Sequence, residues 1–416
     1  MKGEDFLILA DPVIAAAFPS LEKLYREFHA HPELSGQEEW TSRRLAGELE
    51  DAGYTVTRGV GGHGLVALLE NGPGQRVMIR ADMDALPVRE ETGLSYQSRR
   101  KATDPKGREV EVMHACGHDL HMTALLGAAR TFSALRRHWT GTLMLIGQPS
   151  EETVSGSAMM MGDGLYTRFG RPDAALSFHV APDLPEGVIG YREGIFTAGS
   201  ESLDITVRGV GGHAAHPEQT RDPVVAAARM ILAFQTIVSR EMPPDEFAVI
   251  TVASVHGGLK HNAIPEEVIL QVNIRYFDPK IRDLLLAAIR RTADGVALSS
   301  GIPRELMPRI DLLPESVLPL VNDPALTDRV AKAFVRSFGS DYVRCIKPLT
   351  GSEDFGLFAQ ADPPVPVCYF RLGCDDGKGS CGYLHSSRFS PDTSLIRTAV
   401  SALVVAAAEL LDTPSR

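Results

Sequence analysis

Residues 113–122, Met-His-Ala-Cys-Gly-His-Asp-Leu-His-Met, crowd several metal-binding side chains into one short segment. Cys116 and His118 lie two residues apart just before a predicted helix, and in an extended stretch residues two apart point to the same face. A thiolate and an imidazole together suit a borderline divalent ion such as zinc, nickel, cobalt or manganese. The alternative is a catalytic or buried cysteine beside an unrelated histidine, but the three histidines of this segment favour a metal site.

The motif Gln-Pro-Ser-Glu-Glu at residues 148–152 follows an apolar strand predicted at residues 143–146. In α/β enzymes, ligands bind at the carboxyl ends of strands. Adjacent side chains diverge, so one of Glu151 and Glu152 can bind a metal while the other faces the attacking water as a general base. Taken alone, the motif favours the first turn of a solvated helix over a metal site, because glutamates there complement the helix dipole.

Two further histidines complete the candidate ligands. His179 follows a strand predicted at residues 174–178, and His385 lies in a loop near the C-terminus. Each of these histidines alone is more often a structural residue. Together with Cys116, His118 and a glutamate, they give candidate ligands that all lie at a strand end or in a loop, and this convergence favours a metal site.

Two other motifs carry weaker signals. Residues 59–64, Gly-Val-Gly-Gly-His-Gly, match the dinucleotide-binding pattern, but residues 65–69 predict a strand where that pattern needs a helix. Cys374 and Cys381 lie in a Gly-rich loop, with no zinc-finger spacing and no second Cys/His pair close by. The first motif therefore predicts a hairpin turn, and the second predicts ordinary reduced thiols.

The elements that must position these residues alternate between strands and helices, which predicts an α/β layered sheet. Ser20 is predicted to cap a helix that ends near residue 31, and residues 38–52 predict a second helix. Residues 203–296 differ, because their β-α-β-β-α order is self-contained and typical of a small antiparallel sandwich. The sequence therefore predicts one α/β domain with a mixed sheet, residues 1–197 and 311–416, interrupted by an inserted α+β domain at residues 198–310.

Composition limits the class of function. The 416 residues include 42 basic and 53 acidic side chains, and the formal charge of −11 disfavours a nucleic-acid partner. The odd number of cysteines, five, does not fit a disulfide framework. The apolar run at residues 6–10 is too short for a signal peptide, and no stretch approaches the ~18 apolar residues of a membrane span. We therefore expect a cytoplasmic protein without a membrane partner.

A series of motifs along nearly the whole chain resembles the metallopeptidase family of hippurate hydrolases, plant auxin–amino acid conjugate hydrolases, aminoacylases and carboxypeptidases. In order, the motifs are Ala-Asp-Met-Asp-Ala-Leu-Pro (81–87), His-Ala-Cys-Gly-His-Asp (114–119), Gln-Pro-Ser-Glu-Glu (148–152), His-Val (179–180), Gly-Val-Gly-Gly-His-Ala-Ala-His-Pro (209–217), His-Asn-Ala-Ile-Pro (261–265), Gly-Ser-Glu-Asp-Phe (351–355) and Leu-His-Ser (384–386). As an ordered set they are highly specific. One departure is Ser150, where the family more often has alanine.

The resemblance implies a catalytic α/β domain around two divalent metal ions and an inserted lid domain that usually also forms the dimer. It implies that Glu151 is the general base, which activates water and later passes the proton to the leaving amine, and that Cys116 bridges the metals. The ligands that it implies are Cys116, His118, Glu152, His179 and His385. The metal stays open among zinc, manganese, cobalt and nickel.

The resemblance also implies roles outside the ligand set. His213 would stabilise the oxyanion from the lid and reach a neighbouring subunit's site; Asn262, Arg275 and Gly351 would bind substrate; Asp82 and Asp84 would support the ligands or bind a metal weakly. Arg275 suits a free carboxylate, because a guanidinium binds a carboxylate through two hydrogen bonds. The alternatives are that Arg275 pairs with a surface acid and that His213 caps a local turn. His216 and His256 are further candidates.

These roles together imply hydrolysis of the amide bond of small N-acyl amino acids by a homodimer or higher homo-oligomer. A carboxypeptidase or dipeptidase with the same site is the closest alternative. A thiol hydrolase that uses Cys116 with His118 is an alternative of another class. A binding protein without activity is disfavoured, because a binder has no need of the base Glu151.

Overall fold

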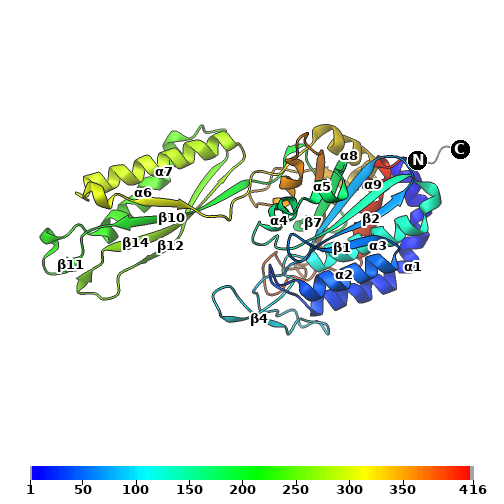
Figure 1. The fold of residues 1–416 in the computed structure, drawn as a ribbon, viewed down its shortest axis with the longest axis horizontal. Helices are drawn as coiled ribbons and strands as arrows, with labels where there is room; N and C mark the ends of the chain where they lie inside the picture. Colours follow the sequence, from blue (N-terminus) through cyan, green and yellow to red (C-terminus); the bar gives the residue numbers. More distant parts are fainter. Residues whose placement is uncertain (1, 413–416) are drawn as a thin grey trace. The chain divides into compact units, whose positions relative to one another are not determined.

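The computed structural model of the chain describes residues 2–412 (Figure 1), and these residues divide into two compact units. Unit 1 contains the residues up to Phe196, the segment Val321–Pro348 and the residues from Asp354 onward. Unit 2 contains Thr197–Leu320 and the short segment Leu349–Glu353. Each unit has a hydrophobic core of its own. The catalytic and lid roles of the two domains stay predictions.

Unit 1 is built on a mixed eight-stranded sheet in the order β1-β2-β6-β3-β7-β18-β8-β17. The neighbours β6, β3, β7 and β18 run parallel, while β1 with β2, β2 with β6 and β18 with β8 pair antiparallel. Parallel strands end at one edge of a sheet, so β3 and β6 place Asp82 beside Gln148. The strands are β1 (Thr55–Val60), β2 (Gly64–Asn71), β3 (Arg76–Asp82), β6 (Gly141–Gln148), β7 (Ala174–Pro185), β8 (Ile189–Tyr191), β17 (Val343–Cys345) and β18 (Val367–Asp375). This mixed α/β architecture confirms the predicted fold class.

Two central helices of unit 1, α3 and α9, are buried on nearly all sides. They lie against β3 and β7 and also pack against each other and against α1, so that both faces of each helix are covered. The helices are α1 (Gly3–Ala30), α2 (Glu39–Asp51), α3 (His118–Ala134), α4 (Gly156–Gly162), α5 (Leu165–Phe169), α8 (Pro324–Phe338) and α9 (Leu395–Leu410). Two small antiparallel pairs complete the unit, β4 (Lys101–Thr103) with β5 (Glu109–Glu111) and β9 (Gly194–Ile195) with β16 (Val321–Asn322).

The predicted start of the first helix at Ser20 is wrong, because α1 begins at Gly3 and continues through Pro12 and Pro19. A proline inside a helix costs about 3 kcal/mol. The early turns bury Phe6 and Ile14 in the core, and burial of a side chain of this size contributes about 1.5–3 kcal/mol. Packing of the apolar stripe thus offsets much of the local cost of the prolines.

Unit 2 is an antiparallel sheet in the order β12-β14-β10-β15, packed against two helices. Its strands are β10 (Gly199–Arg208), β12 (Ala248–Gly257), β14 (Glu267–Tyr276) and β15 (Arg309–Leu312), and its helices are α6 (Pro223–Glu241) and α7 (Pro279–Ser299). In chain order, β10, α6, β12, β14 and α7 follow the predicted β-α-β-β-α order. β15 adds a strand beside β10, and a two-residue pair, β11 (Gly212–His213) with β13 (Ala263–Ile264), lies apart from the main sheet.

Of the described helices, α6 is the one whose length and composition would suffice to cross a membrane. This differs from the expectation that no stretch approaches the length of a membrane span. Met230, Phe234 and Ile237 on one face of α6 belong to the core of unit 2, and Arg229 and Arg240 interrupt its apolar run. Packing within unit 2 therefore accounts for the apolar residues on that face.

Candidate metal centre

A tight turn at the start of α3 positions the first two candidate ligands. Cys116 lies in the turn, and His118 is the first residue of the helix. Gly117 between them has a φ of 82°, and a Cβ at this position would lie 2.6 Å from Cγ2 of Val180. The turn therefore requires glycine, since other residues disfavour this φ and would collide with β7.

The other candidate ligands come from distant parts of the chain. His179 lies inside β7, which continues beyond it instead of ending at residue 178 as predicted. Glu152 follows β6. His385 lies in the loop between β18 and α9 with a φ of 63°, and its backbone N–H donates to the carbonyl of Ala115 at 2.8 Å. The loop is thereby fixed against the turn that carries Cys116.

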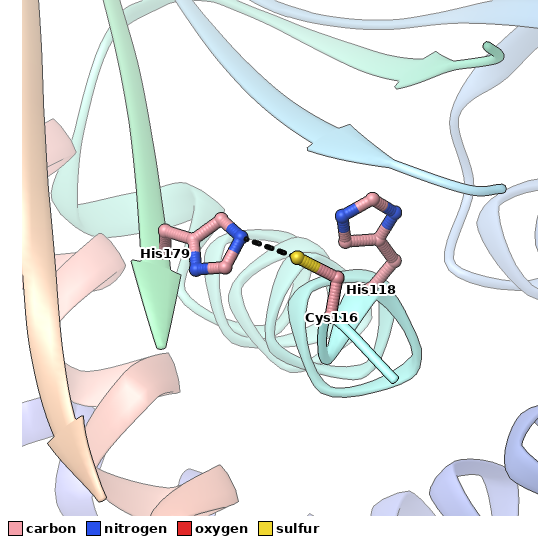
Figure 2. Close-up of side chains that lie close together, drawn as sticks. All are labelled: Cys116, His118 and His179. Atoms are coloured by element: carbon pink, nitrogen blue, oxygen red, sulfur yellow. Dashed lines mark hydrogen bonds between the residues drawn. The ribbon is translucent and has the colours of Figure 1, made fainter. Parts of the chain in front are cut away.

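The structure brings the five predicted ligands together. Cys116 Sγ lies 3.3 Å from His179 Nε2, with His118 beside them (Figure 2), and 3.2 Å from His385 Nε2. Glu152 places Oε2 3.6 Å from His385 Nε2 and Oε1 3.9 Å from His118 Nε2. Two groups of ligand atoms, Cys116/His118/His179 and Cys116/Glu152/His385, each lie within 4.8 Å and share the thiol. A thiol, imidazoles and a carboxylate at these separations would suit divalent metal ions.

The donor atoms of this cluster fit metal ions. His118 Nε2 and Glu152 Oε1 are buried without a hydrogen-bond partner, and such atoms cost about 1–3 kcal/mol each when left unsatisfied. His118 Nδ1 lies 2.8 Å from the carbonyl oxygen of Asp84, and His179 Nδ1 lies 2.7 Å from that of Val180. Because a carbonyl only accepts, both rings carry the proton on Nδ1 and direct the Nε2 lone pair at the cluster.

The electrostatics point to a missing positive charge at the same place. Burial, followed by Glu152 and Glu151, raises the pKa of the Cys116 thiol. Burial also raises the pKa of Glu152 to about 7, with Asp84 contributing in the same direction. Burial alone would lower the pKa of His118, but Asp82 and Asp84 outweigh it and raise the pKa to about 10. A divalent cation reverses these preferences, because it favours a thiolate, a carboxylate and a neutral imidazole.

Asp82 connects the cluster to a buried arginine. Its Oδ1 lies 2.6 Å from His121 Nδ1, and its Oδ2 accepts from Arg80 Nη1 at 2.6 Å and lies 3.7 Å from His118 Nε2. Arg80 also donates to Gln148 and Asp354. Arg80 was not predicted as a site residue, because a single arginine in an apolar strand does not reveal its partners.

Asp84 holds the segment that carries the two glutamates. Its Oδ2 accepts from the backbone N–H of Glu152 at 2.9 Å and from Ser35 Oγ at 2.6 Å. Asp84 thus contacts His118 through its carbonyl at 2.8 Å and its Oδ1 at 3.4 Å, and Glu152 through Oδ2. Asp82 and Asp84 both lie behind the candidate ligands, and their assigned roles stay predictions.

Glu38 is a functional candidate that the sequence did not identify. Its side chain is fully buried, and Oε1 accepts from the backbone N–H of Ser150 at 2.8 Å and from that of Gly36 at 2.9 Å. Ser150 has a φ of 54°, which is unfavourable for a residue with a Cβ. Glu38 therefore stabilises the strained loop that presents Glu151, whose Oε2 lies 4.0 Å from His118 Nε2.

In unit 2, His213 lies in the exposed β11–β13 pair, and Asn262 directly precedes β13. The backbone N–H of Ala214 donates to the carbonyl of Asn262 at 3.1 Å. His213 Nδ1 accepts from the backbone N–H of Ala215 at 3.0 Å. Since a backbone N–H only donates, the neutral ring of His213 carries its proton on Nε2, where it can serve a further acceptor.

Arg275 lies half-buried in β14 and contacts the segment that contains Gly351. Its Nη1 donates to the carbonyl of Thr350 at 2.9 Å and to Ser352 Oγ at 3.1 Å. Both of these hydrogen-bond acceptors are neutral, and burial lowers the pKa of the Arg275 guanidinium. Within unit 2, Arg275 therefore bonds to neutral groups and not to a surface acid, which was the alternative to substrate binding.

Known proteins resemble the chain over nearly its whole length. The sequence model of Peptidase family M20/M25/M40 matches residues 78–407. An IAA-amino acid hydrolase of Arabidopsis thaliana is 34% identical over 377 residues, which cover 89% of this chain and 80% of the plant protein. Thermostable carboxypeptidase 1 of Saccharolobus solfataricus is 34% identical over 380 residues, covering 90% and 91% of the two chains. A Bacillus subtilis structure, described as a dinuclear metal binding peptidase from the M20 family, has a TM-score of 0.78 at 26% identity and covers 96% of this chain and 100% of its own.

Proposed function

The chain belongs to peptidase family M20/M25/M40, and from this premise we propose that it hydrolyses the amide bond of small N-acyl amino acids with two bound divalent metal ions. The observation that carries the proposal is the convergence of a thiol, imidazoles and a carboxylate on one point, beside the buried Glu151. The similar plant protein, named for IAA-amino acids, supports an acyl–amino acid substrate.

In this proposal Cys116, His118, Glu152, His179 and His385 would hold the two metal ions. When bound, the ions supply Lewis-acid polarisation of the scissile carbonyl and a lower pKa for the attacking water. Cys116 and His118 are buried, and burial strengthens their electrostatic interactions, while His385 lies at the exposed side of the site. The identity of the metal among zinc, manganese, cobalt and nickel is left to measurement.

Glu151 acts as the proton carrier. It lies next to the ligand Glu152 in a loop held by Glu38 and Asp84, so its carboxylate is fixed while remaining outside the proposed ligand set. It takes a proton from the attacking water and returns it to the nitrogen of the leaving amine. Amide hydrolysis needs both transfers, because hydroxide is the stronger nucleophile and a neutral amine is the better leaving group.

Two residues of unit 2 are proposed to bind the substrate. His213 donates its Nε2–H to the developing oxyanion, a role that the proton position in its ring supports. Arg275 binds the free carboxylate of the amino acid, because it is half-buried and held only by neutral acceptors. Asn262 and Gly351 are the neighbouring substrate contacts in this proposal.

A carboxypeptidase is the second candidate function. The similarity to a thermostable carboxypeptidase favours it, and Arg275 would bind the C-terminal carboxylate of a peptide equally well. A thiol hydrolase is disfavoured, because burial and the neighbouring glutamates raise the pKa of the Cys116 thiol, which is the opposite of what a thiolate nucleophile needs.

The test combines metal analysis with a substrate panel. Purified protein is analysed for bound metal and then assayed on N-acyl amino acids and on dipeptides, before and after chelation. Activity on acyl amino acids that is lost on chelation and restored by a divalent transition metal supports the proposal. Activity confined to peptides selects the carboxypeptidase. Full activity in metal-free protein refutes the metal assignment and makes Cys116 the nucleophile.

We also propose that the chain forms a homodimer or higher homo-oligomer through unit 2 and acts in the cytoplasm. Unit 2 exposes the apolar side chains of Val225, Leu232 and Val255, which an interface would cover. Sedimentation analysis of the purified chain, alone and with Leu232→Glu, tests the assembly. A monomeric wild-type chain would contradict it.

A further inference from the structure

Two buried thiols outside the metal centre face each other in unit 1. Cys374 lies near the end of β18, Cys381 lies in the loop that follows, and their Sγ atoms are 3.2 Å apart. A disulfide bond is about 2.05 Å long, so the sulfur atoms need to approach by only about 1.2 Å. Of the other three cysteines, Cys345 is exposed, Cys368 is buried and Cys116 belongs to the metal centre.

The loop between the two thiols is held in shape by its own side chains. Asp376 accepts hydrogen bonds from the backbone N–H of Lys378 at 2.9 Å and from the hydroxyl of Ser380. Gly377 and Gly379 have φ values of 70° and 73°, which glycine adopts without strain. These features hold the loop in the conformation in which the two sulfur atoms lie 3.2 Å apart.

We propose that Cys374 and Cys381 form a redox-active dithiol that hydrogen peroxide converts to an intramolecular disulfide and that thiol reductants restore. The sulfur of Cys381 attacks one oxygen of the peroxide, the O–O bond breaks, and a sulfenic acid and one water form. The sulfur of Cys374 then attacks the sulfenic sulfur, the S–S bond forms, and a second water leaves. Two thiols and one peroxide thus give one disulfide and two waters, with two electrons passing to the peroxide.

A cavity gives the oxidant access to the pair. Its volume is about 970 Å³, and both cysteines line it together with Arg26, Lys378 and Arg388. The hydrogen-bonding interaction between the two thiols lowers the pKa of Cys381, which agrees with Cys381 as the attacking sulfur. The cavity therefore joins an accessible surface to the thiol that reacts first.

The disulfide would fasten the loop that carries His385. The backbone N–H of Ser390 donates to the carbonyl of Cys381 at 2.7 Å, so Cys381 lies at the base of the segment 381–390. A bond from Cys381 to Cys374 ties this base covalently to β18. The oxidised chain therefore holds residues 382–390 more rigidly than the reduced chain, whether or not the proposed hydrolase activity is correct.

The experiment uses the full-length chain treated with hydrogen peroxide, blocked with an alkylating reagent and digested without reduction. The expected product is a cross-linked peptide pair containing Cys374 and Cys381, two hydrogens lighter than the reduced peptides and removed by dithiothreitol. Cys345→Ser is the matched control and should keep the cross-link, whereas Cys381→Ser should lose it. If both thiols remain open to alkylation while Cys345 is oxidised, the proposal is refuted.

Hydrogen exchange provides a second readout that does not depend on activity. Oxidation should slow amide exchange across residues 382–390 in the wild-type chain and leave it unchanged in the Cys374→Ser/Cys381→Ser variant. A cross-link without slower exchange would confirm the disulfide but overturn its effect on the His385 loop. Equal slowing in the double variant would assign the effect to another oxidised residue and overturn the same step.

Discussion

Replacement of Glu38 by glutamine should stabilise unit 1 at high pH and leave its stability unchanged at low pH. Burial, with Asp84 adding to it, raises the pKa of Glu38 from 4.5 to about 7. Between these pH values the folded chain keeps a proton that the unfolded chain releases, so wild-type stability falls as the pH rises through this window. One pKa unit corresponds to about 1.4 kcal/mol, so the charged form costs the folded chain about 3 kcal/mol above pH 7.

Glu38→Gln removes this cost while keeping an acceptor for the N–H of Ser150. The variant should equal the wild type near pH 4.5 and exceed its free energy of unfolding by about 3 kcal/mol at pH 8. Both tryptophans of the chain, Trp40 and Trp139, lie in unit 1, so urea unfolding followed by tryptophan fluorescence reports on this unit.

The measurement is made in the presence of a chelator, so that metal binding does not contribute. Glu39→Gln is the matched control, because the Glu39 side chain is 71% exposed and its replacement should show no pH-dependent difference. A difference between Glu38→Gln and wild type that stays constant from pH 4.5 to 8, or that favours the wild type at pH 8, would refute the assignment of a buried, neutral Glu38.

Three further changes test the site. Glu151→Gln should lower kcat about 10²- to 10⁴-fold with unchanged metal content, since it removes the proton carrier but no proposed ligand; kinetics and elemental analysis check this. Asp82→Asn should weaken metal affinity about 10- to 100-fold, because Asp82 contacts His121 and His118, and competition with a chelator measures it. Arg275→Ala should raise KM about 10- to 100-fold for substrates with a free carboxylate and leave it unchanged for the corresponding primary amides, because hydrogen bonds to charged groups contribute about 1.5–3 kcal/mol.

The sequence predicted the parts of the site that depend on local spacing. Cys116 and His118 are separated by one glycine, and the turn that glycine allows determines their geometry. His179 and His385 were found through alternation of elements and an ordered set of motifs, since strand ends gather at one edge of a sheet. The α/β sheet of unit 1 and the β-α-β-β-α order of unit 2 were predicted from the alternation of strand and helix patterns along the chain.

The contacts that the sequence missed join residues far apart along the chain. Glu38 bonds to Ser150 across 112 positions, and Arg80 bonds to Asp354 across 274. In the sequence, Glu38 is only the first residue of a predicted helix, because local propensity contains no information on what a side chain meets in the fold. The start of α1 was missed in the same way, since Pro12 and Pro19 dominate the local pattern while the packing of Phe6 decides the structure.

Backbone strain in the described chain coincides with these long-range contacts. Ser150, Val154 and His385 are the non-glycine residues with positive φ in residues 2–412. Each such conformation costs about 1–3 kcal/mol and persists only where the surroundings fix it. Ser150 and Val154 flank the two glutamates, and His385 is itself a proposed ligand. The bonds from Ser150 to Glu38, from Glu152 to Asp84 and from His385 to Ala115 therefore act together, because they hold a strained backbone in the conformation that points all the candidate ligands at one place.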